Sequence, residues 1–268
     1  MQYSPEQFLW LFLFYAFLGW CAEVAYAAVK TGTFVNRGMV NGPVCPIYGF
    51  GVLLVLLLLR PLVFHPPLLF LGAALLTTLL EFLCGWLLEK LFREKWWDYS
   101  DQPCNLKGYV CLKFSLLWGL ACLPVVYLLH PALLLLLECL CGKLPFRILL
   151  ALLCLLFAVD VTVTLLELAK LPRRLQAIED TQRRIRELSG RIGERLTGGV
   201  LGAAAILDDT RDTLREDREA LAQYRLRLRE QLDRRNFVHE RLLRAFPALG
   251  KGRYKDAVAR LLAHRKEK

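Results

Sequence analysis

Five long apolar segments before residue 170 constrain the fold of this chain more than any other feature. They cover residues 8–29, 42–59, 67–90, 109–129 and 146–168. Each is close to the roughly 20 residues that a helix needs to cross a bilayer. Hydrophobic residues make up 56% of the 268 residues, which is high for a water-soluble domain. We therefore predict an all-α, polytopic helical membrane protein with about five transmembrane helices.

Charge divides the chain near residue 170. Ten basic and ten acidic residues precede Lys170, whereas 25 basic and 15 acidic residues occur from Lys170 onward, so the net charge of +10 belongs to the C-terminal part. Leucines recur there at seven-residue spacing, from Leu207 to Leu228, which is typical of coiled-coil pairing. We predict a transmembrane domain at 1–170, a cytoplasmic helical hairpin or dimeric coiled coil at 171–246, and a basic segment at 247–268.

The arginine-rich tail invites two interpretations of its partner. Basic stripes bind nucleic-acid phosphates, but acids interleave with the arginines, as in Arg215, Glu216, Asp217 and Arg218. That mixture is typical of a solvated helix with ion pairs between successive turns. We therefore expect attraction to anionic lipid, and self-association or docking of a cytoplasmic protein, rather than nucleic-acid binding.

Basic residues flank the apolar segments unevenly. They are frequent after the first, third and fifth segments and sparse elsewhere. The positive-inside rule then predicts that the N-terminus is outside and the C-terminus cytoplasmic. The first segment lacks a basic leader and carries Glu23, so we expect it to be retained rather than cleaved as a signal peptide.

A short pattern occurs twice in the apolar part. Gly19-Trp20-Cys21-Ala22-Glu23 recurs as Gly85-Trp86-Leu87-Leu88-Glu89. Each copy is followed by a polar loop with an asparagine just before a glycine, and then by another apolar segment. We interpret the pattern as a repeated helical hairpin, an arrangement found in transporters. Recurring small residues and interfacial tryptophans of any helical membrane protein are the alternative explanation.

Ionisable residues inside the apolar segments point to a polar site. At about 1.5 Å per residue, Glu23, Glu81 and Asp160 lie about 21–22 Å from the outer ends of their segments. A lipid-facing charge costs at least a few kcal/mol, so we expect these acids to face one another, a cavity or a cationic partner. Glu23 lies at the same depth as Glu81, but in the repeated pattern it corresponds to Glu89, so the sequence leaves both pairings open. Lys113 is within reach of Glu81 or Glu89. Glu89 and Lys113 also suit a second role as anchors of helix ends.

Two loops on the predicted cytoplasmic side carry the remaining candidates. Glycine and proline are too dense between residues 36 and 49 for ordinary helix, and irregular backbone at membrane depth must be buried or line a wet cavity. Trp96 to Asn105 adds aromatics and acids, and we expect part of it to contact residues 36–49. Cys45 and Cys104 each lie beside a proline; packing is the preferred role and a reactive thiol the alternative. The nine cysteines show no metal-ligand spacing.

The segments GWCAE, FVNRGMVNGPVCPIYGFG, the helix from Glu81 to Glu89, and WDYSDQPCNLKGYVCLKFSLLWG resemble the bacterial family of putative ABC-transporter type IV, or CmpB-like, membrane proteins. The resemblance covers roughly residues 8–130. It implies a multi-pass protein of the bacterial inner membrane that acts as a transporter permease. By position, the family pattern falls on Glu23, Asn36, Arg37, Gly38, Gly42, Pro43, Cys45, Pro46, Tyr48, Gly49, Asp98, Tyr99, Ser100, Asn105, Gly108, Ser115, Trp118 and Gly119.

Three functions compete on these observations. The first is a transport component with a polar site between helices that faces the cytoplasmic half. The second is a membrane scaffold or regulator that acts through its basic tail. The third is an enzyme using loop residues such as Asp98 and Arg37, for which there is no recognisable nucleophile or metal motif. The chain has no G-x-x-x-x-G-K-[ST] phosphate loop, so ATP hydrolysis would need a separate ATPase, and we expect no cofactor.

Overall fold

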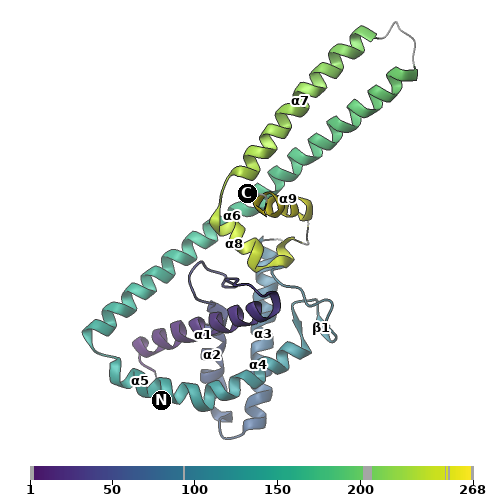
Figure 1. The fold of residues 1–268 in the computed structure, drawn as a ribbon. Coiled ribbons are helices and arrows are strands. Elements are labelled where there is room, and N and C mark those ends of the chain that lie inside the picture. Colours follow the sequence, from purple (N-terminus) through teal and green to yellow (C-terminus); the bar gives the residue numbers. More distant parts are fainter. Residues whose placement is uncertain (1–2, 93, 202–206, 251, 253, 267–268) are drawn as a thin grey trace. The chain divides into compact units, whose positions relative to one another are not determined.

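The computed structural model describes residues 3–92, 94–201, 207–250, 252 and 254–266. Apart from a two-stranded hairpin, the regular elements of this part of the chain are helices (Figure 1). In chain order they are α1 (Pro5–Thr31), α2 (Pro46–Leu58), η1 (Arg60–Leu62), α3 (Pro66–Phe92), β1 (Asn105–Leu106), β2 (Val110–Cys111), α4 (Leu112–Pro124), η2 (Val125–Leu129), α5 (His130–Leu140), α6 (Leu144–Leu201), α7 (Leu207–Asp233), α8 (Phe237–Ala245), η4 (Pro247–Gly250) and α9 (Lys255–Lys266).

The chain forms two compact units. The membrane unit holds Met1–Ala169 and Arg241–Gly252, and the tail unit holds Lys170–Glu240 and Arg253–Lys268. The predicted domains at 1–170, 171–246 and 247–268 stay predictions. Residues 241–252, which charge alone places in the tail, pack within the membrane unit.

Four helical stretches in the described residues are long and apolar enough to cross a membrane. They are Pro5–Thr31, Pro66–Phe92, Leu112–Leu140 and Leu144–Leu196. The other predicted segment contains α2, whose 13 residues rise only about 20 Å against a hydrocarbon core of about 30 Å. The count of about five spans is therefore not confirmed, and the sides of the two termini stay a prediction.

Local sequence sets the bounds of α1. Ser4 and Gln7 form a capping box at its start, and Pro5 occupies the first turn, where its missing N–H costs nothing. Gly32 ends the helix with a φ of 69°, in the left-handed region that glycine adopts without strain. The break opens an irregular segment, residues 32–45, which we call the first loop.

Near its start, α1 is held to α5 through His130. The hydroxyls of Tyr3 and Tyr15 lie 3.0 Å from Nε2 and Nδ1 of His130, so both ring nitrogens are hydrogen-bonded. His130 is buried, and an unpartnered ring nitrogen there would lose its hydration without compensation. These contacts fix the register between α1 and α5.

Helices α1 and α2 pack closely because α2 carries small residues at the crossing. Gly49 and Leu53 lie buried against α1, beside Leu11 and Phe12. A Cβ at Gly49 would lie 2.7 Å from the Phe12 ring and 2.8 Å from the Phe12 carbonyl oxygen. Small residues allow this close approach in membrane helices.

We expect Gly49→Ala to destabilise the protein by about 1–3 kcal/mol, because overpacking forces helices apart. Unfolding in mixed micelles, followed by circular dichroism, measures the change. Gly51→Ala is the matched control two residues along the same helix, since its Cβ would lie 3.4 Å from Leu80, an ordinary contact. Equal stability of the two variants would contradict the assignment of Gly49 to a tight helix crossing.

The tail unit contains an antiparallel helical pair. The part of α6 after Lys170 and α7 run side by side (Figure 1), and Arg195 Nη1 lies 2.6 Å from Asp217 Oδ2 between them. Leu175, Ile178 and Leu221 are buried on the inner faces. Gly198 and Gly199 continue α6, while Gly202 of the predicted bend lies outside the described residues. A dimeric coiled coil stays a prediction.

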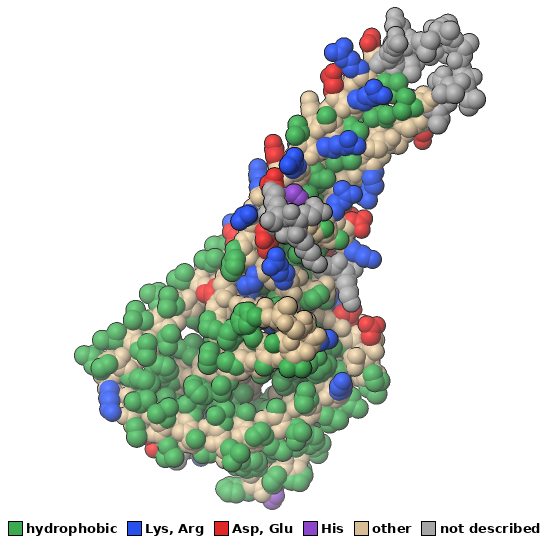
Figure 2. Space-filling model, in the orientation of Figure 1, with side chains coloured by type: hydrophobic (Ala, Val, Ile, Leu, Met, Phe, Trp, Pro, Cys, Tyr) green, Lys and Arg blue, Asp and Glu red, His purple; other side chains and the backbone are tan. Residues whose placement is uncertain are grey.

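Surface chemistry differs between the units. Hydrophobic side chains cover the visible face of the membrane unit, whereas charged side chains crowd the helical pair of the tail unit (Figure 2). Exposed leucines include Leu75, Leu128 and Leu155, each more than 60% accessible. Such a surface is stable in lipid and would aggregate in water.

Candidate functional site

The first loop is folded around Asn36. Its Oδ1 accepts from Trp20 Nε1 at 2.7 Å and from the Gly38 backbone N–H at 2.9 Å, and its Nδ2 donates to the Asn41 carbonyl oxygen at 2.9 Å. One amide side chain thus ties the loop to α1 and closes it on itself. This accounts for an asparagine at position 36, since it both accepts and donates.

Asp160 of α6 holds the other end of the first loop. Its Oδ1 accepts from the backbone N–H of Asn41 at 3.0 Å and from Asn41 Nδ2 at 2.8 Å, and its Oδ2 accepts from the Gly42 N–H at 2.6 Å. Thr164, one turn further along α6, accepts a bond from Asn41 Nδ2 at 3.1 Å. The carboxylate therefore satisfies the backbone of the first loop and does not meet Glu23 or Glu81 through any of these bonds.

Arg241 reaches the first loop from α8. Its guanidinium donates to the carbonyl oxygens of Gly38 at 2.6 Å and Met39 at 2.9 Å, and to Asn41 Oδ1 at 3.1 Å. The residue is buried. Burial lowers the pKa of Arg241, and the Asp160 carboxylate opposes this shift. Arg241 and Asp160 thus hold the same segment of loop from two elements.

Glu23 of α1 has a cationic and a neutral partner. Arg37 Nε lies 3.0 Å from Glu23 Oε2, and the Tyr48 hydroxyl donates to Glu23 Oε1 at 2.6 Å. Tyr48 in turn meets the edge of Trp118, with ring centroids 5.4 Å apart. The carboxylate therefore faces protein rather than lipid, as the cost of an unpaired charge in the membrane requires.

Glu81 of α3 lies in the same neighbourhood as Glu23. The Tyr99 hydroxyl donates to Glu81 Oε1 at 3.3 Å, and Tyr99 stacks on Phe114 with centroids 4.9 Å apart. Burial raises the pKa of Tyr99, and the Glu81 and Glu23 carboxylates add to the rise. The Oε2 atom of Glu81 is buried with no hydrogen-bond partner. The influence of both carboxylates on Tyr99 favours the pairing of Glu23 with Glu81, which stays a prediction.

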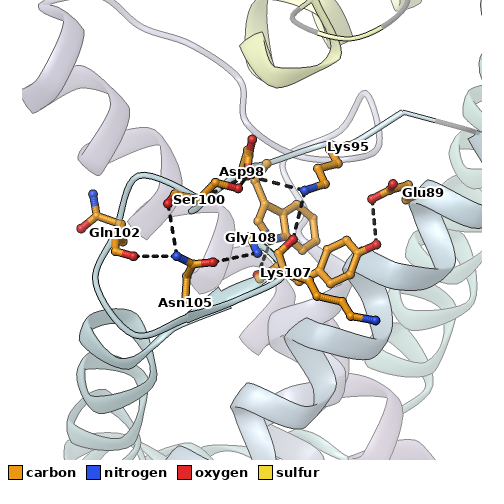
Figure 3. A network of polar contacts seen from close by, with 10 residues as sticks. Glu89, Lys95, Asp98, Ser100, Gln102, Asn105, Lys107 and Gly108 are labelled. Carbon is orange, nitrogen blue, oxygen red and sulfur yellow. Dashed lines mark hydrogen bonds and ion pairs between the residues drawn. The ribbon is translucent and has the colours of Figure 1, made fainter.

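The second loop, residues 94–111, is organised by Asn105 (Figure 3). Asn105 Nδ2 donates to the carbonyl oxygen of Gln102 at 2.8 Å, and its Oδ1 accepts from the Gly108 N–H at 3.2 Å. Asp98 Oδ1 accepts from the Ser100 hydroxyl at 2.5 Å and lies 3.8 Å from Lys95 Nζ. Asn105 thus closes the second loop as Asn36 closes the first: each side chain donates to a backbone carbonyl oxygen and accepts from a glycine N–H of its own loop.

The two G-W-x-x-E segments share a packing arrangement. A tyrosine ring lies where a Cβ would project from each glycine: Tyr48 at Gly19 and Tyr109 at Gly85. The glutamate four residues later accepts from that tyrosine, at 2.6 Å in the first copy and 2.8 Å in the second. The hydrogen bond to Glu89 raises the pKa of Tyr109. A Cβ at Gly19 would overlap the Tyr48 ring, so glycine is needed there, whereas a Cβ at Gly85 would lie 3.1 Å from the Tyr109 ring, a tight contact that a small shift of the ring relieves.

Comparison with known proteins identifies the family. The family model described as putative ABC-transporter type IV matches residues 10–165, more than half of the chain. The chain belongs to the putative ABC-transporter type IV family. No curated protein and no solved structure matches it.

The other residues on which the pattern of the type IV family falls serve the loops and helix ends. Pro46 begins α2 and Pro43 is exposed. Ser115 Oγ of α4 donates at 3.0 Å to the carbonyl oxygen of Cys111, the residue that precedes the helix. The Cys45 side chain is buried, which favours packing over reactivity.

Lys113 and Cys104 stand apart from the acids of this type IV chain. Lys113 Nζ lies 5.9 Å from the centroid of the Phe114 ring, and in the described residues it forms no ion pair with Glu81 or Glu89. Cys104 is exposed in the second loop with a φ of 52°. Within the described residues, no group of His, Cys, Asp and Glu is placed to hold a metal ion.

Sequence reasoning missed Arg241, Asn41 and Phe246. The type IV match ends at residue 165, and the change of charge near residue 170 assigns Arg241 and Phe246 to the tail. Phe246 packs edge-on against Trp96 of the second loop, with centroids 4.9 Å apart. Residues 241–252 therefore contact both loops, a link that we expected the loops to make directly. Of these three residues, only Asn41 could have been found beforehand, because Asn41-Gly42 is a turn signal within the first loop.

Proposed function

We propose that this chain is the membrane-spanning component of a transporter, with a polar site between helices built by Glu23 and Glu81. The observation that carries the proposal is that Glu23 of α1 accepts from Tyr48 and Glu81 of α3 accepts from Tyr99, while both carboxylates raise the pKa of Tyr99. A buried carboxylate oxygen without a partner, Glu81 Oε2, is costly in a folded protein. It therefore supports a role in binding a proton, a cation or a polar solute.

The first loop would cover this site. Arg37 comes from that loop and pairs with Glu23, so movement of the loop would change the charge balance at the carboxylate. The family name supports coupling to a separate ATPase, because this chain has no phosphate-binding loop. The charged tail unit is the proposed docking place for that partner or for a second copy of the chain, on the cytoplasmic side of a bacterial inner membrane.

Glu81→Gln tests the polar site, because glutamine still accepts from Tyr99 but carries no charge. Membrane vesicles containing the chain and its native partners are supplied with ATP and a mixture of small solutes, and mass spectrometry measures accumulation. We expect the solute gathered by the wild type to accumulate about tenfold less in the variant, a change of ~1.4 kcal/mol. Glu138→Gln, an exposed acid of α5, is the control.

Equal accumulation by the wild type and Glu81→Gln would contradict a pathway at this site. Accumulation of no solute by wild-type vesicles would favour a second function, a non-transporting scaffold. The observation behind that alternative is the paired helices of the tail unit, held by Arg195 and Asp217. They present charged faces suited to a protein partner rather than to lipid.

A further inference from the structure

A pocket away from Glu23 and Glu81 is lined by Trp86, Glu89, Lys90 and Tyr109. Its volume is about 380 Å³, within the roughly 300–1,000 Å³ of small-molecule sites. Three of the four residues lie in the last two turns of α3. The proposed transport site does not use this pocket.

Opposite charges line the pocket without pairing. Glu89 Oε2 accepts from the Tyr109 hydroxyl at 2.8 Å, while Lys90 Nζ lies 5.0 Å from the centroid of the Trp86 ring. Successive residues on a helix do not face each other, and in the described residues no ion pair joins Glu89 to Lys90. The pocket therefore offers one anionic and one cationic group, each with capacity for a further partner.

The depth of the pocket indicates what reaches it. The 27 residues of α3 rise about 40 Å, so the helix is longer than the thickness of a hydrocarbon core, which is about 30 Å. Its last turns then lie among lipid headgroups, where tryptophan is enriched and lysine extends its ammonium toward water. Trp86 is 44% exposed, which leaves the ring open to lipid.

We propose that this pocket binds the headgroup of a phospholipid with a primary amine, of the phosphatidylethanolamine type. The ammonium of the lipid donates to Glu89, and its phosphate pairs with Lys90. A quaternary choline has no N–H to donate, and a glycerol headgroup has no positive charge for the carboxylate. The proposal does not depend on whether the chain transports a solute.

Helix α1 supplies an internal control for this chemistry. Tyr26 and Lys30 repeat the spacing of Trp86 and Lys90, with Lys30 Nζ 5.9 Å from the tyrosine ring centroid. Val29 stands where α3 has Glu89, and it is exposed. The α1 pair thus has the aromatic ring and the cation but lacks the acceptor for an amine.

The test uses the full chain in nanodiscs that hold phosphatidylethanolamine, phosphatidylcholine and phosphatidylglycerol in equal amounts. After mild detergent extraction, native mass spectrometry counts the lipids that stay bound. We expect the wild type to retain the ethanolamine lipid preferentially. Glu89→Gln, which still accepts from Tyr109, and the exposed Lys90→Gln should each reduce this retention about tenfold, or ~1.4 kcal/mol. Lys30→Gln should leave it unchanged.

Three outcomes would overturn the proposal. The first is equal retention of the three lipids by the wild type. The second is a preference for phosphatidylglycerol, which attraction to cations alone would produce. The third is a loss of ethanolamine-lipid retention in Lys30→Gln as large as that in Lys90→Gln. A thermal unfolding curve shows that each variant is folded before its lipids are counted. Should Glu89→Gln fail to fold, Lys90→Gln alone decides the result.

Discussion

Replacing Asp160 with alanine is expected to destabilise the protein by about 3–5 kcal/mol, among the largest effects of any single substitution in this chain. The carboxylate accepts from the backbone N–H groups of Asn41 and Gly42 and from the Asn41 side chain. Hydrogen bonds to a charged group contribute about 1.5–3 kcal/mol each, and Asp160 is only partly exposed. The substitution also removes the anion that favours the buried charge of Arg241.

Unfolding in mixed micelles measures this loss, and the fluorescence of Trp20 reports on the first loop through its bond to Asn36. Glu138→Ala is the control, because it removes an exposed acid from an apolar helix. Asp160→Asn should fall between the alanine variant and the wild type. Its amide keeps one acceptor but turns a donor toward either Asn41 or Gly42. Wild-type stability of Asp160→Ala would mean that the first loop is held by other contacts.

The sequence predicted the membrane helices and the irregular first loop because both depend on local patterns. Apolar length predicted about five membrane helices, and four stretches of the described residues are long and apolar enough to cross a bilayer. The density of glycine and proline predicted irregular backbone over residues 36–49, but α2 begins at Pro46, so the irregular segment ends at residue 45. The 1.5 Å rise per residue also predicts that Glu23 and Glu81 share a level, and both carboxylates raise the pKa of Tyr99. A rise along one helix, however, says nothing about the direction in which a side chain points.

Asp160 shows this limit most clearly. Its depth predicts a level shared with Glu23 and Glu81, where it would face another acid, a cavity or a cation, but it accepts from the backbone of the first loop and from the Asn41 side chain. Irregular backbone at membrane depth needs acceptors for its N–H groups, and a carboxylate on a neighbouring helix supplies them. The position of Asp160 is therefore constrained by two effects: the cost of exposing its charge to lipid, and the need of the N–H groups of the first loop for acceptors. Sequence spacing alone does not rank the two.

The apparent end of the membrane part near residue 170 has a similar explanation. Composition changes there, and the boundary between the two compact units falls between Ala169 and Lys170, but the helix α6 continues through Pro172. Residues 241–252 pack within the membrane unit. One of the contacts that hold them there joins Arg241 to Asn41, which are 200 residues apart in sequence. Neither composition nor periodicity carries information on such a distant pairing.

Because residues 241–252 pack within the membrane unit, we predict a second large effect. Arg241→Ala should destabilise the protein by about 3–5 kcal/mol. The guanidinium donates to two carbonyl oxygens and one amide oxygen of the first loop, in a planar fork that lysine cannot reproduce. Arg241→Lys should therefore lose more than half of the same stability. Arg244→Ala, one turn further along α8 and exposed, is the matched control and should change stability by less than about 0.5 kcal/mol.

A double-mutant cycle separates this role from general damage to α8. Because Asp160 and Arg241 hold the same loop, the loss in the double variant should fall short of the sum of the single losses by about 1–3 kcal/mol. Additive losses would show that the two residues act on independent parts of the structure. The same contacts make truncation at residue 170 a poor test of the tail, because it also removes Arg241. Shortening α6 and α7 together by matching heptads keeps Arg241 and Phe246, so any loss of function then belongs to the tail unit itself.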